Sequence, residues 1–470
     1  MARRSKHPRL PNGYGQIRYL GKNRRNPYGV YPPAVEEYEN GQKKPPKAIC
    51  YVDDWIKGFA ILTAYRAGTY VPGMERDLPS DKSADTKRVI QRLLADYNQA
   101  QGIRPEEPEP TPEPVPELTP EEKLDEIINA MIDAMPLEDK VAGLFFVAPE
   151  SITGVTAAVK AGEGTRESLT RYAVGGLLYQ KKNIKDAEQF REMLGNTELY
   201  SKYPLFLGIE EEGGSVSPLA AAGLVDKQPS PADLGAGGDP GAAYQAGSSL
   251  GAGLASYGIN VDFAPAADLA NVEGSVMAAR AYGSDAGTVS AYVNGMVSGL
   301  QEQKVTACLK HFPCGGGTAE DTGEGQAVSE RSAEDLRGQE LAVYQAGIDS
   351  GVQMIMVGHT AVPSLTGDNT PASLSGIIVT DLLRVEMGYR GVIITDAMNL
   401  KAISEYYDSG QAAVMALKAG CDMVLMPENF EEAYEAVLGA VRDGTISEER
   451  VNDALRRIYR IKCADRLEQG

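Results

Sequence analysis

The chain has 470 residues, a hydrophobic content of 43% and a formal net charge of −19 at pH 7. This length allows two or three domains, and there is no run of about 18 or more apolar residues that could cross a membrane. The basic, polar N-terminus has no apolar segment typical of secretion signals, so we expect a cytoplasmic location, with a secreted origin of the C-terminal part as the alternative. The five cysteines are scattered and form no CxxC pair, which argues against a disulfide framework or a zinc site.

Residues 1–100 are predicted to form a small basic α+β domain. Up to residue 71, about 13 Lys or Arg stand against about 5 Asp or Glu in a chain that is acidic overall. Hydrophobic patterning predicts strands at 13–20, 29–31 and 48–52, and helices at 55–68 and at the amphipathic run 86–97.

Part of this basic segment matches a known pattern. The sequences RLPNGYGQIRYLGKNRRNPYGVY (9–31) and ICYVDDWIKGFAILTAYRAG (49–68) resemble the arm-type DNA-binding domain of tyrosine recombinases, the integrases. Lys and Arg interleaved with Tyr suit contact with phosphates and sugars, so the resemblance implies DNA contact through residues 1–72. A basic surface without a partner is the alternative. No recombinase catalytic domain follows in the sequence.

Residues 101–123 are predicted to be an extended acidic linker, because Pro alternates with Glu there. Residues 124–465 are then expected to form a single α/β domain, in which eight apolar runs alternate with helical stretches. The runs are 143–147, 175–179, 204–210, 259–265, 305–312, 353–359, 391–397 and 421–427. Apolar runs without alternation are typical of strands covered on both faces, so we expect a (β/α)8 TIM-type barrel, with a doubly wound sheet as the alternative.

Polar residues stand at or near the C-terminal ends of several of these runs. They are Glu210, Asp262, Lys310, His311, His359 and Asp396. Because barrel enzymes place their sites at this end of the strands, the pattern predicts that these side chains share one site.

Four segments together resemble a family of glycosidases. They are CLKHFPCGGGTAEDTGEG (308–325), GVIITDAMNL (391–400), IEEEGGSVSP (209–218) and AARAYGSD (278–285). The family is glycoside hydrolase family 3, in its β-N-acetylhexosaminidase branch, whose signature loop runs Lys-His-Phe-Pro-Gly-His-Gly and then Asp-Ser/Thr-His. The resemblance implies a retaining hydrolase of terminal GlcNAc-type β-glycosides, including peptidoglycan fragments, that needs no metal or organic cofactor.

The resemblance also implies roles for individual residues. Asp396 takes the position of the nucleophile, and Asp321 that of the acid which orients the acid/base histidine. The residues implied to contact the sugar are Glu210, Arg280, Lys310, His311 and His359. Taken without the resemblance, the alternatives are a helix cap for Asp396, a surface ion pair for Arg280 and an interior histidine for His359.

Two positions depart from the family pattern. Gly323 stands where the branch keeps its acid/base histidine, so catalysis with poor leaving groups is expected to fall by about 10²- to 10⁴-fold. Pro218 replaces a sugar-binding arginine, so affinity or substrate choice should differ. Glu324, or Glu320, is a candidate substitute acid, with solvated loop charges as the alternative, and glycines 315–317 are expected to make the loop flexible.

These departures leave two other classes of function open. The first is a catalytically inactive glycan-binding protein, which would keep the site and lack turnover. The second is a DNA-binding fusion protein in which the integrase-type segment carries the function.

Overall fold

The computed structural model describes residues 15–22, 24–33, 45–66, 68–78 and 118–464. The chain divides into two units, Met1–Glu117 and Leu118–Gly470, and each has its own hydrophobic core. The predicted helix 86–97 and most of the predicted linker 101–123 lie outside the described residues.

The N-terminal unit is a small α+β domain, as the sequence predicts. Its strands form an antiparallel sheet in the order β1-β2-β3, followed by one helix and a 3-10 turn: β1 (Gln16–Tyr19), β2 (Tyr28–Tyr31), β3 (Cys50–Val52), α1 (Trp55–Arg66) and η1 (Met74–Arg76). Ile61 and Leu62 of α1 pack with Val30, Cys50 and Val52 of the sheet. The apolar residues that predict these strands and this helix thus form the small core of the unit.

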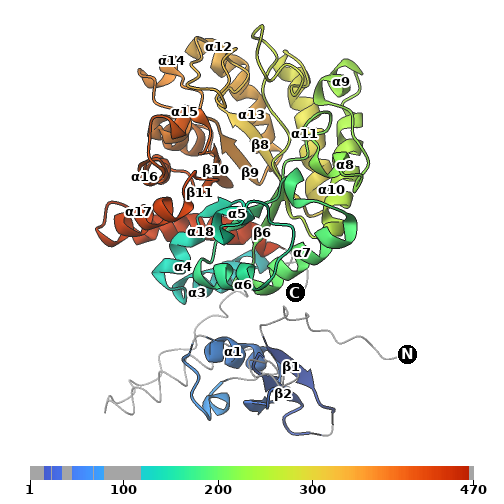
Figure 1. Ribbon diagram of the computed structural model, residues 1–470, viewed down its shortest axis with the longest axis vertical. Coiled ribbons are helices and arrows are strands. Elements are labelled where there is room, and N and C mark those ends of the chain that lie inside the picture. The colour runs from blue at the N-terminus through green and yellow to red at the C-terminus, as the bar shows by residue number, and fades with distance from the viewer. Residues whose placement is uncertain (1–14, 23, 34–44, 67, 79–117, 465–470) are drawn as a thin grey trace, which may run out of the picture. The chain divides into compact units, whose positions relative to one another are not determined.

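The second unit is a closed barrel of eight parallel strands (Figure 1). The strands are β4 (Phe145–Val147), β5 (Gly176–Leu178), β6 (Phe206–Ile209), β7 (Val261–Asp262), β8 (Thr306–Phe312), β9 (Met354–Val357), β10 (Val392–Ala397) and β11 (Met423–Leu425). Each lies within one of the eight predicted apolar runs. Because β11 pairs with β4 and closes the sheet, the doubly wound alternative is wrong.

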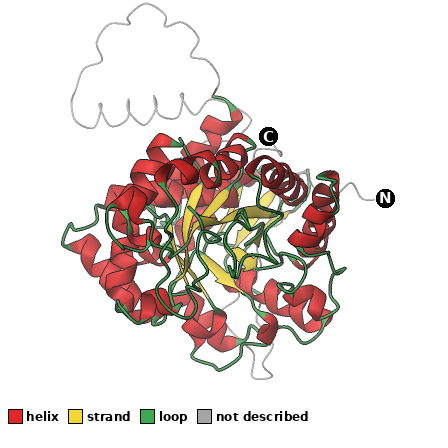
Figure 2. Cartoon of the chain, turned by 90° about the horizontal axis from the view of Figure 1, so that it is seen from above, coloured by secondary structure: helices red, strands yellow, loops and turns green. Residues whose placement is uncertain are grey.

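Helices surround the barrel and connect its strands (Figure 2). In chain order they are α3 (Pro120–Asp133), α4 (Leu137–Ala142), α5 (Pro149–Thr153), α6 (Glu163–Arg171), η3 (Lys181–Asn183), α7 (Ala187–Tyr200), α8 (Pro218–Ala221), α9 (Pro231–Ala236), α10 (Gly241–Tyr257), α11 (Ala286–Glu302), α12 (Ala333–Gly338), α13 (Glu340–Asp349), α14 (Pro363–Thr366), η4 (Ala372–Leu374), η5 (Ile377–Glu386), α15 (Lys401–Ser404), α16 (Ser409–Ala419), α17 (Phe430–Arg442) and α18 (Glu448–Lys462). Within the described ranges, no helix is long and apolar enough to cross a membrane.

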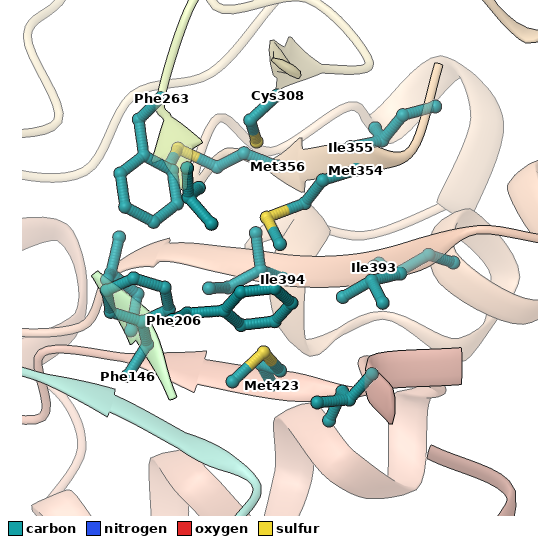
Figure 3. Close-up of a cluster of buried hydrophobic side chains, with 14 of the residues drawn as sticks. Phe146, Phe206, Phe263, Cys308, Met354, Ile355, Met356, Ile393, Ile394 and Met423 are labelled. Carbon is teal, nitrogen blue, oxygen red and sulfur yellow. The ribbon is translucent and has the colours of Figure 1, made fainter. Parts of the chain in front are cut away.

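Aromatic side chains and methionines fill the inside of the barrel (Figure 3). The Phe146 ring packs against Phe206 and Phe263, with centroid distances of 6.1 and 5.0 Å. A Cβ atom added at Gly176 or Gly208 would lie 2.6 or 2.5 Å from the Phe146 ring. The two glycines therefore make room for this ring, and the barrel has a solid core beneath the ends of its strands.

A buried ion cluster lies at the opposite, N-terminal end of the strands. Asp422, directly before β11, accepts hydrogen bonds from Arg384 (2.7 Å) and Arg457 (2.9 Å) and from the backbone N–H of Ile393 (2.9 Å). Because Arg384 comes from η5 and Arg457 from α18, this carboxylate ties two peripheral helices to the sheet. The pattern of the sequence did not predict it.

Candidate active site

The C-terminal ends of four strands of the barrel carry most of the predicted polar side chains. Glu210 directly follows β6, Asp262 is the last residue of β7, Lys310 and His311 lie in β8, and Asp396 lies in β10. Because all eight strands run in the same direction, these ends meet at one end of the barrel.

Two acids and two bases form one connected ion network. The Lys310 ammonium contacts both Glu210 and Glu212, with a distance of 2.5 Å from Nζ to Glu212 Oε1. The Arg280 guanidinium donates from Nε to Glu212 Oε2 at 2.8 Å and from Nη2 to Glu210 Oε1 at 3.3 Å. The structure thus brings together three of the predicted sugar-contacting residues, and Glu212 is a fourth member that the sequence did not single out.

Exposure divides this network into a buried part and a part open to solvent. The side chains of Glu212 and Lys310 are each 1% exposed, whereas that of Glu210 is 44% exposed. Arg280 is intermediate, at 23%. Glu212 therefore acts as the fixed counter-ion beneath, and Glu210 and Arg280 present hydrogen-bonding groups at the open end of the barrel.

The buried charges of the network hold each other in the ionised state. Burial alone would raise the pKa of Glu212, but Lys310 and Arg280 outweigh burial and lower it to about 2. Burial alone would lower the pKa of Lys310, but the two neighbouring glutamates outweigh burial and raise it. Removing one member would leave an uncompensated buried charge, so the four side chains are a unit.

Asp396 is half-buried and its carboxylate does not cap a helix. Its Oδ1 accepts a hydrogen bond from the N–H of Ala397 at 2.7 Å, while the residue that precedes α15 is Leu400, which makes no side-chain cap. Burial would raise the pKa of Asp396, but several effects outweigh burial and lower the pKa, and the electrostatic interaction with His311 is the largest of them. The helix-cap alternative is therefore wrong, and the group is an anion at neutral pH, as a nucleophile requires.

His359 lies in the interior and has no free ring nitrogen. Its Nδ1 is 2.8 Å from Ser373 Oγ, and its Nε2 is 3.0 Å from the backbone carbonyl oxygen of Ala397. Burial lowers the pKa of His359, so the ring is neutral. The interior alternative describes this residue, which supports the backbone next to Asp396 and leaves no ring nitrogen for a sugar.

The signature loop after β8 crosses to the segment that follows β10. The N–H of Ala402 donates to the carbonyl oxygen of Thr322 at 3.0 Å, and Lys401 forms an ion pair with Glu324 at 2.7 Å. Asp321 is exposed, and its Oδ1 accepts a hydrogen bond from the N–H of Gly323 at 2.8 Å. Asp321 therefore holds the backbone of its own loop at Gly323, the position where the family pattern has a histidine.

The predicted substitute acids do not have the environment that a proton donor needs. Glu324 is exposed, and its ion pair with Lys401 lowers the pKa of its carboxyl, which is the wrong direction for an acid at neutral pH. Glu320 is also exposed and accepts a hydrogen bond from the N–H of Val328 at 2.8 Å. In this structure both are solvated loop charges, so the substitute-acid interpretation is corrected.

The three glycines of the signature loop are packed closely, contrary to the flexible loop that we expected. A Cβ atom at Gly316 would lie 2.4 Å from the carbonyl oxygen of Leu269, and one at Gly315 would lie 2.9 Å from Asp268 Oδ1. A Cβ atom at Gly317 would lie 2.9 Å from Ser329 Oγ. Gly315 and Gly316 leave no room for a side chain because the loop closely approaches the segment after β7, and Gly317 leaves none because Ser329 lies against it.

Substituting Gly316 with Ala is expected to destabilise the barrel by about 1 to 3 kcal/mol, because the backbone has to move to admit the methyl group. Gly325→Ala is the matched control on the same loop, since a Cβ atom there meets nothing within 4 Å. Urea unfolding of both variants measures the difference. Equal stability of the two would contradict the close packing of this loop.

Asp262 is fully buried, and only one of its oxygens has a partner. Oδ1 accepts a hydrogen bond from the N–H of Glu211 at 2.8 Å, whereas Oδ2 has none. Burial raises the pKa of Asp262 well above its ordinary value, which favours the protonated form in the folded protein. We therefore expect Asp262 to be neutral next to the ion network.

Asp262→Asn is expected to be more stable than the unsubstituted chain at pH 7, and much less so at pH 4. A raised folded pKa means that unfolding releases a proton above the unfolded pKa, so the natural residue loses stability as pH rises, by up to about 1.4 kcal/mol per pH unit. An asparagine side chain does not titrate, so the variant does not lose stability with rising pH in this way. Urea unfolding at both pH values tests it, and a stability difference independent of pH would contradict a protonated Asp262.

Comparison with known proteins agrees with this architecture. The family model described as "Glycosyl hydrolase family 3 N terminal domain" matches residues 136–461. A protein of Nitrosomonas eutropha named "Beta-hexosaminidase" is 31% identical over 284 residues, 58% of this chain and 79% of that protein. A "Beta-N-acetylglucosaminidase/beta-glucosidase" of Cellulomonas fimi is 29% identical over 307 residues, 63% of this chain but only 53% of the relative.

Solved structures agree as well. A glycoside hydrolase family 3 beta-N-acetylglucosaminidase from a Paenibacillus species superposes with a TM-score of 0.67 and 33% identity, over 72% of this chain and 64% of that one. A Beta-N-acetylhexosaminidase from Beutenbergia cavernae gives a TM-score of 0.62 and 28% identity, over 70% of this chain and 98% of that one. Because the family model matches well over half of the residues, the chain belongs to glycosyl hydrolase family 3.

Proposed function

We propose that the barrel is a retaining glycosidase that removes terminal β-linked GlcNAc-type sugars from amino-sugar glycans or peptidoglycan fragments. The observation that carries the proposal is the ionised Asp396 carboxylate at the same end of the barrel as the network of Glu210, Arg280 and Lys310. The names of the relatives as hexosaminidases and N-acetylglucosaminidases support the choice of sugar.

In the proposed reaction an oxygen of Asp396 attacks the anomeric carbon of the bound sugar. The glycosidic bond breaks, the leaving oxygen takes a proton from solvent water, and a glycosyl ester of Asp396 forms, which a second water then hydrolyses with release of the sugar. At the open end, Arg280 offers donors to the sugar hydroxyls and the exposed Glu210 offers an acceptor. The predicted sugar contact of Lys310 stays a prediction, because its side chain is only 1% exposed beneath them. His311 adds a ring nitrogen beside them.

Proton transfer is the weak step of this proposal. Gly323 supplies no group that could protonate the leaving oxygen, and Asp321 is hydrogen-bonded to the backbone of its own loop. Pro218 begins α8 and has no donor for a sugar group. Poor leaving groups are therefore expected to react slowly, since general acid catalysis contributes about 10²- to 10⁴-fold.

The alternative function is a glycan-binding protein without turnover. It is favoured by one specific observation, the lowered pKa of Glu324, which removes the nearest candidate for a replacement acid on the signature loop. In that case the ion network would still hold a sugar, and Asp396 would remain as an anion that contacts it.

Two substrates distinguish these functions. An aryl N-acetylglucosaminide has a good leaving group that tolerates a missing acid, whereas a natural disaccharide of GlcNAc does not. We expect turnover of the aryl substrate and much slower turnover of the disaccharide. Turnover of neither, together with measurable binding of GlcNAc by calorimetry, would favour the glycan-binding protein, and absence of both turnover and binding would contradict both functions.

DNA contact through residues 1–72 stays a prediction. It is favoured by the sheet face opposite α1, where register and alternation place Gln16, Arg18, Tyr31 and Tyr51, with Arg18 stacked on the Tyr31 ring at 4.8 Å. A gel shift of the full chain on duplex DNA, weakened by added salt, is the expected result. No shift at low salt would contradict it.

A further inference from the structure

Asp268 is a buried acid that lies close to the site and was not singled out from the sequence. It follows β7 by six residues, and its side chain is fully buried. One oxygen, Oδ2, lies 2.8 Å from Nδ1 of His311 and accepts a hydrogen bond from the backbone N–H of the same residue at 3.1 Å. The other, Oδ1, accepts from the N–H of Gly316 at 2.9 Å. One carboxylate thus joins β8, the signature loop and the segment after β7.

The contact with Asp268 decides which nitrogen of the His311 ring carries the proton. A carboxylate accepts only, so Nδ1 has to be the donor, and in a neutral ring Nε2 is then left as an acceptor. His359 has the opposite arrangement, because its Nε2 faces the carbonyl oxygen of Ala397 and has to donate. The two rings beside Asp396 are therefore predicted to be different tautomers.

His311 Nε2 can accept a hydrogen bond, which the neighbouring cations cannot do. Lys310 and Arg280 can only donate hydrogen bonds, whereas a sugar hydroxyl both donates and accepts. The His311 side chain is 13% exposed and lies near the C-terminal end of β8, at the same end of the barrel as Asp396 in β10. Its ring therefore lies at the site that contains the predicted nucleophile.

We infer that Asp268 is a positioning residue, which fixes His311 as the Nδ1–H tautomer so that Nε2 accepts a proton from a sugar hydroxyl. The same carboxylate holds Gly316, so it also sets where the signature loop leaves the barrel. The tautomer stands on the contacts of Asp268 alone, and the sugar contact rests on the proposed function.

Nitrogen NMR of the full chain tests the tautomer without any substrate. The chain contains three histidines, so ¹⁵N-histidine labelling gives three ring systems, which single substitutions assign. At a pH about 2 units above the ordinary histidine pKa of about 6.5, His311 is expected to show a protonated Nδ1 and a bare Nε2, and His359 the reverse. A protonated Nε2 on His311 in the unsubstituted chain would overturn the inference, whether or not any variant folds.

The variant Asp268→Ala extends the test to function. Without the carboxylate, the proton of His311 is expected to move to Nε2, while the His359 signals stay unchanged and report that the barrel is folded. GlcNAc binding is expected to weaken by about 10-fold or more, as for loss of a hydrogen bond to a polar ligand group. Asp285→Asn, which alters only the N-cap of α11, is the control and should change neither the tautomer of His311 nor the affinity for GlcNAc.

The outcomes separate this inference from the proposed function. A shifted tautomer with unchanged GlcNAc affinity would overturn the sugar contact of His311. An unshifted tautomer in Asp268→Ala would overturn the positioning role of Asp268. If the unsubstituted chain has the expected tautomers and binds no amino sugar, the proposed function fails while the assignment of the tautomer stands.

Discussion

Asp396→Asn is expected to lower the turnover of an aryl N-acetylglucosaminide by at least about 10⁴-fold, because removal of a covalent nucleophile has effects of this size. The amide keeps the shape of the side chain and can still accept from the N–H of Ala397. It has no negative charge to attack the anomeric carbon. The loss should therefore lie in kcat, with GlcNAc binding largely retained.

Steady-state kinetics of Asp396→Asn and of a matched variant measure this effect. Asp443→Asn is the control, since this exposed acid follows the C-terminal end of α17, which by the direction of the chain lies at the opposite end of the barrel. The control should keep full activity. Activity of Asp396→Asn within about 10-fold of the unsubstituted chain would show that another group is the nucleophile.

Gly323→His is expected to raise kcat/KM for a GlcNAc disaccharide by about 10²- to 10⁴-fold, the usual contribution of a general acid. A Cβ atom at position 323 would lie 3.1 Å from Asp321 Oδ1, so the new imidazole would start next to a carboxylate that can orient it. For an aryl substrate, whose leaving group needs no proton, kcat/KM should change much less.

Gly325→His is the matched control for this gain. It adds the same imidazole to the same loop, where a Cβ atom meets nothing within 4 Å and so does not start next to the Asp321 carboxylate. We expect no gain with the disaccharide. If Gly323→His is no better than Gly325→His, the position does not face the leaving group, and loss of the histidine does not explain slow turnover.

The strands could be predicted because strands that are buried on both faces have continuous apolar sequences. The position of Asp396 was equally accessible, since the end of a strand in a parallel barrel already points toward the site. What the sequence could not supply was the partner of each charged group. Glu212 reads as one of three glutamates in a loop, and only the fold shows that it is the buried one that pairs with both Lys310 and Arg280.

Two errors have the same physical origin. The sequence predicts that glycines 315–317 are flexible, because it does not show that Asp268, Leu269 and Ser329 lie against them. Glu324 was a candidate acid, because the sequence does not show that Lys401 lies opposite and lowers its pKa. Asp268 was missed because it stands six residues beyond its strand, where chain position alone predicts no contact with His311.

The most direct test of the central claim is to trap the sugar on Asp396. Because Gly323 offers no base to activate water, the glycosyl ester should break down slowly, and a dinitrophenyl N-acetyl-β-glucosaminide should release about one dinitrophenol per chain in a rapid burst. Mass spectrometry of the digested protein is expected to find one N-acetylglucosaminyl group on the peptide that contains Asp396. Turnover without any adduct, or an adduct on a different peptide, would contradict this account.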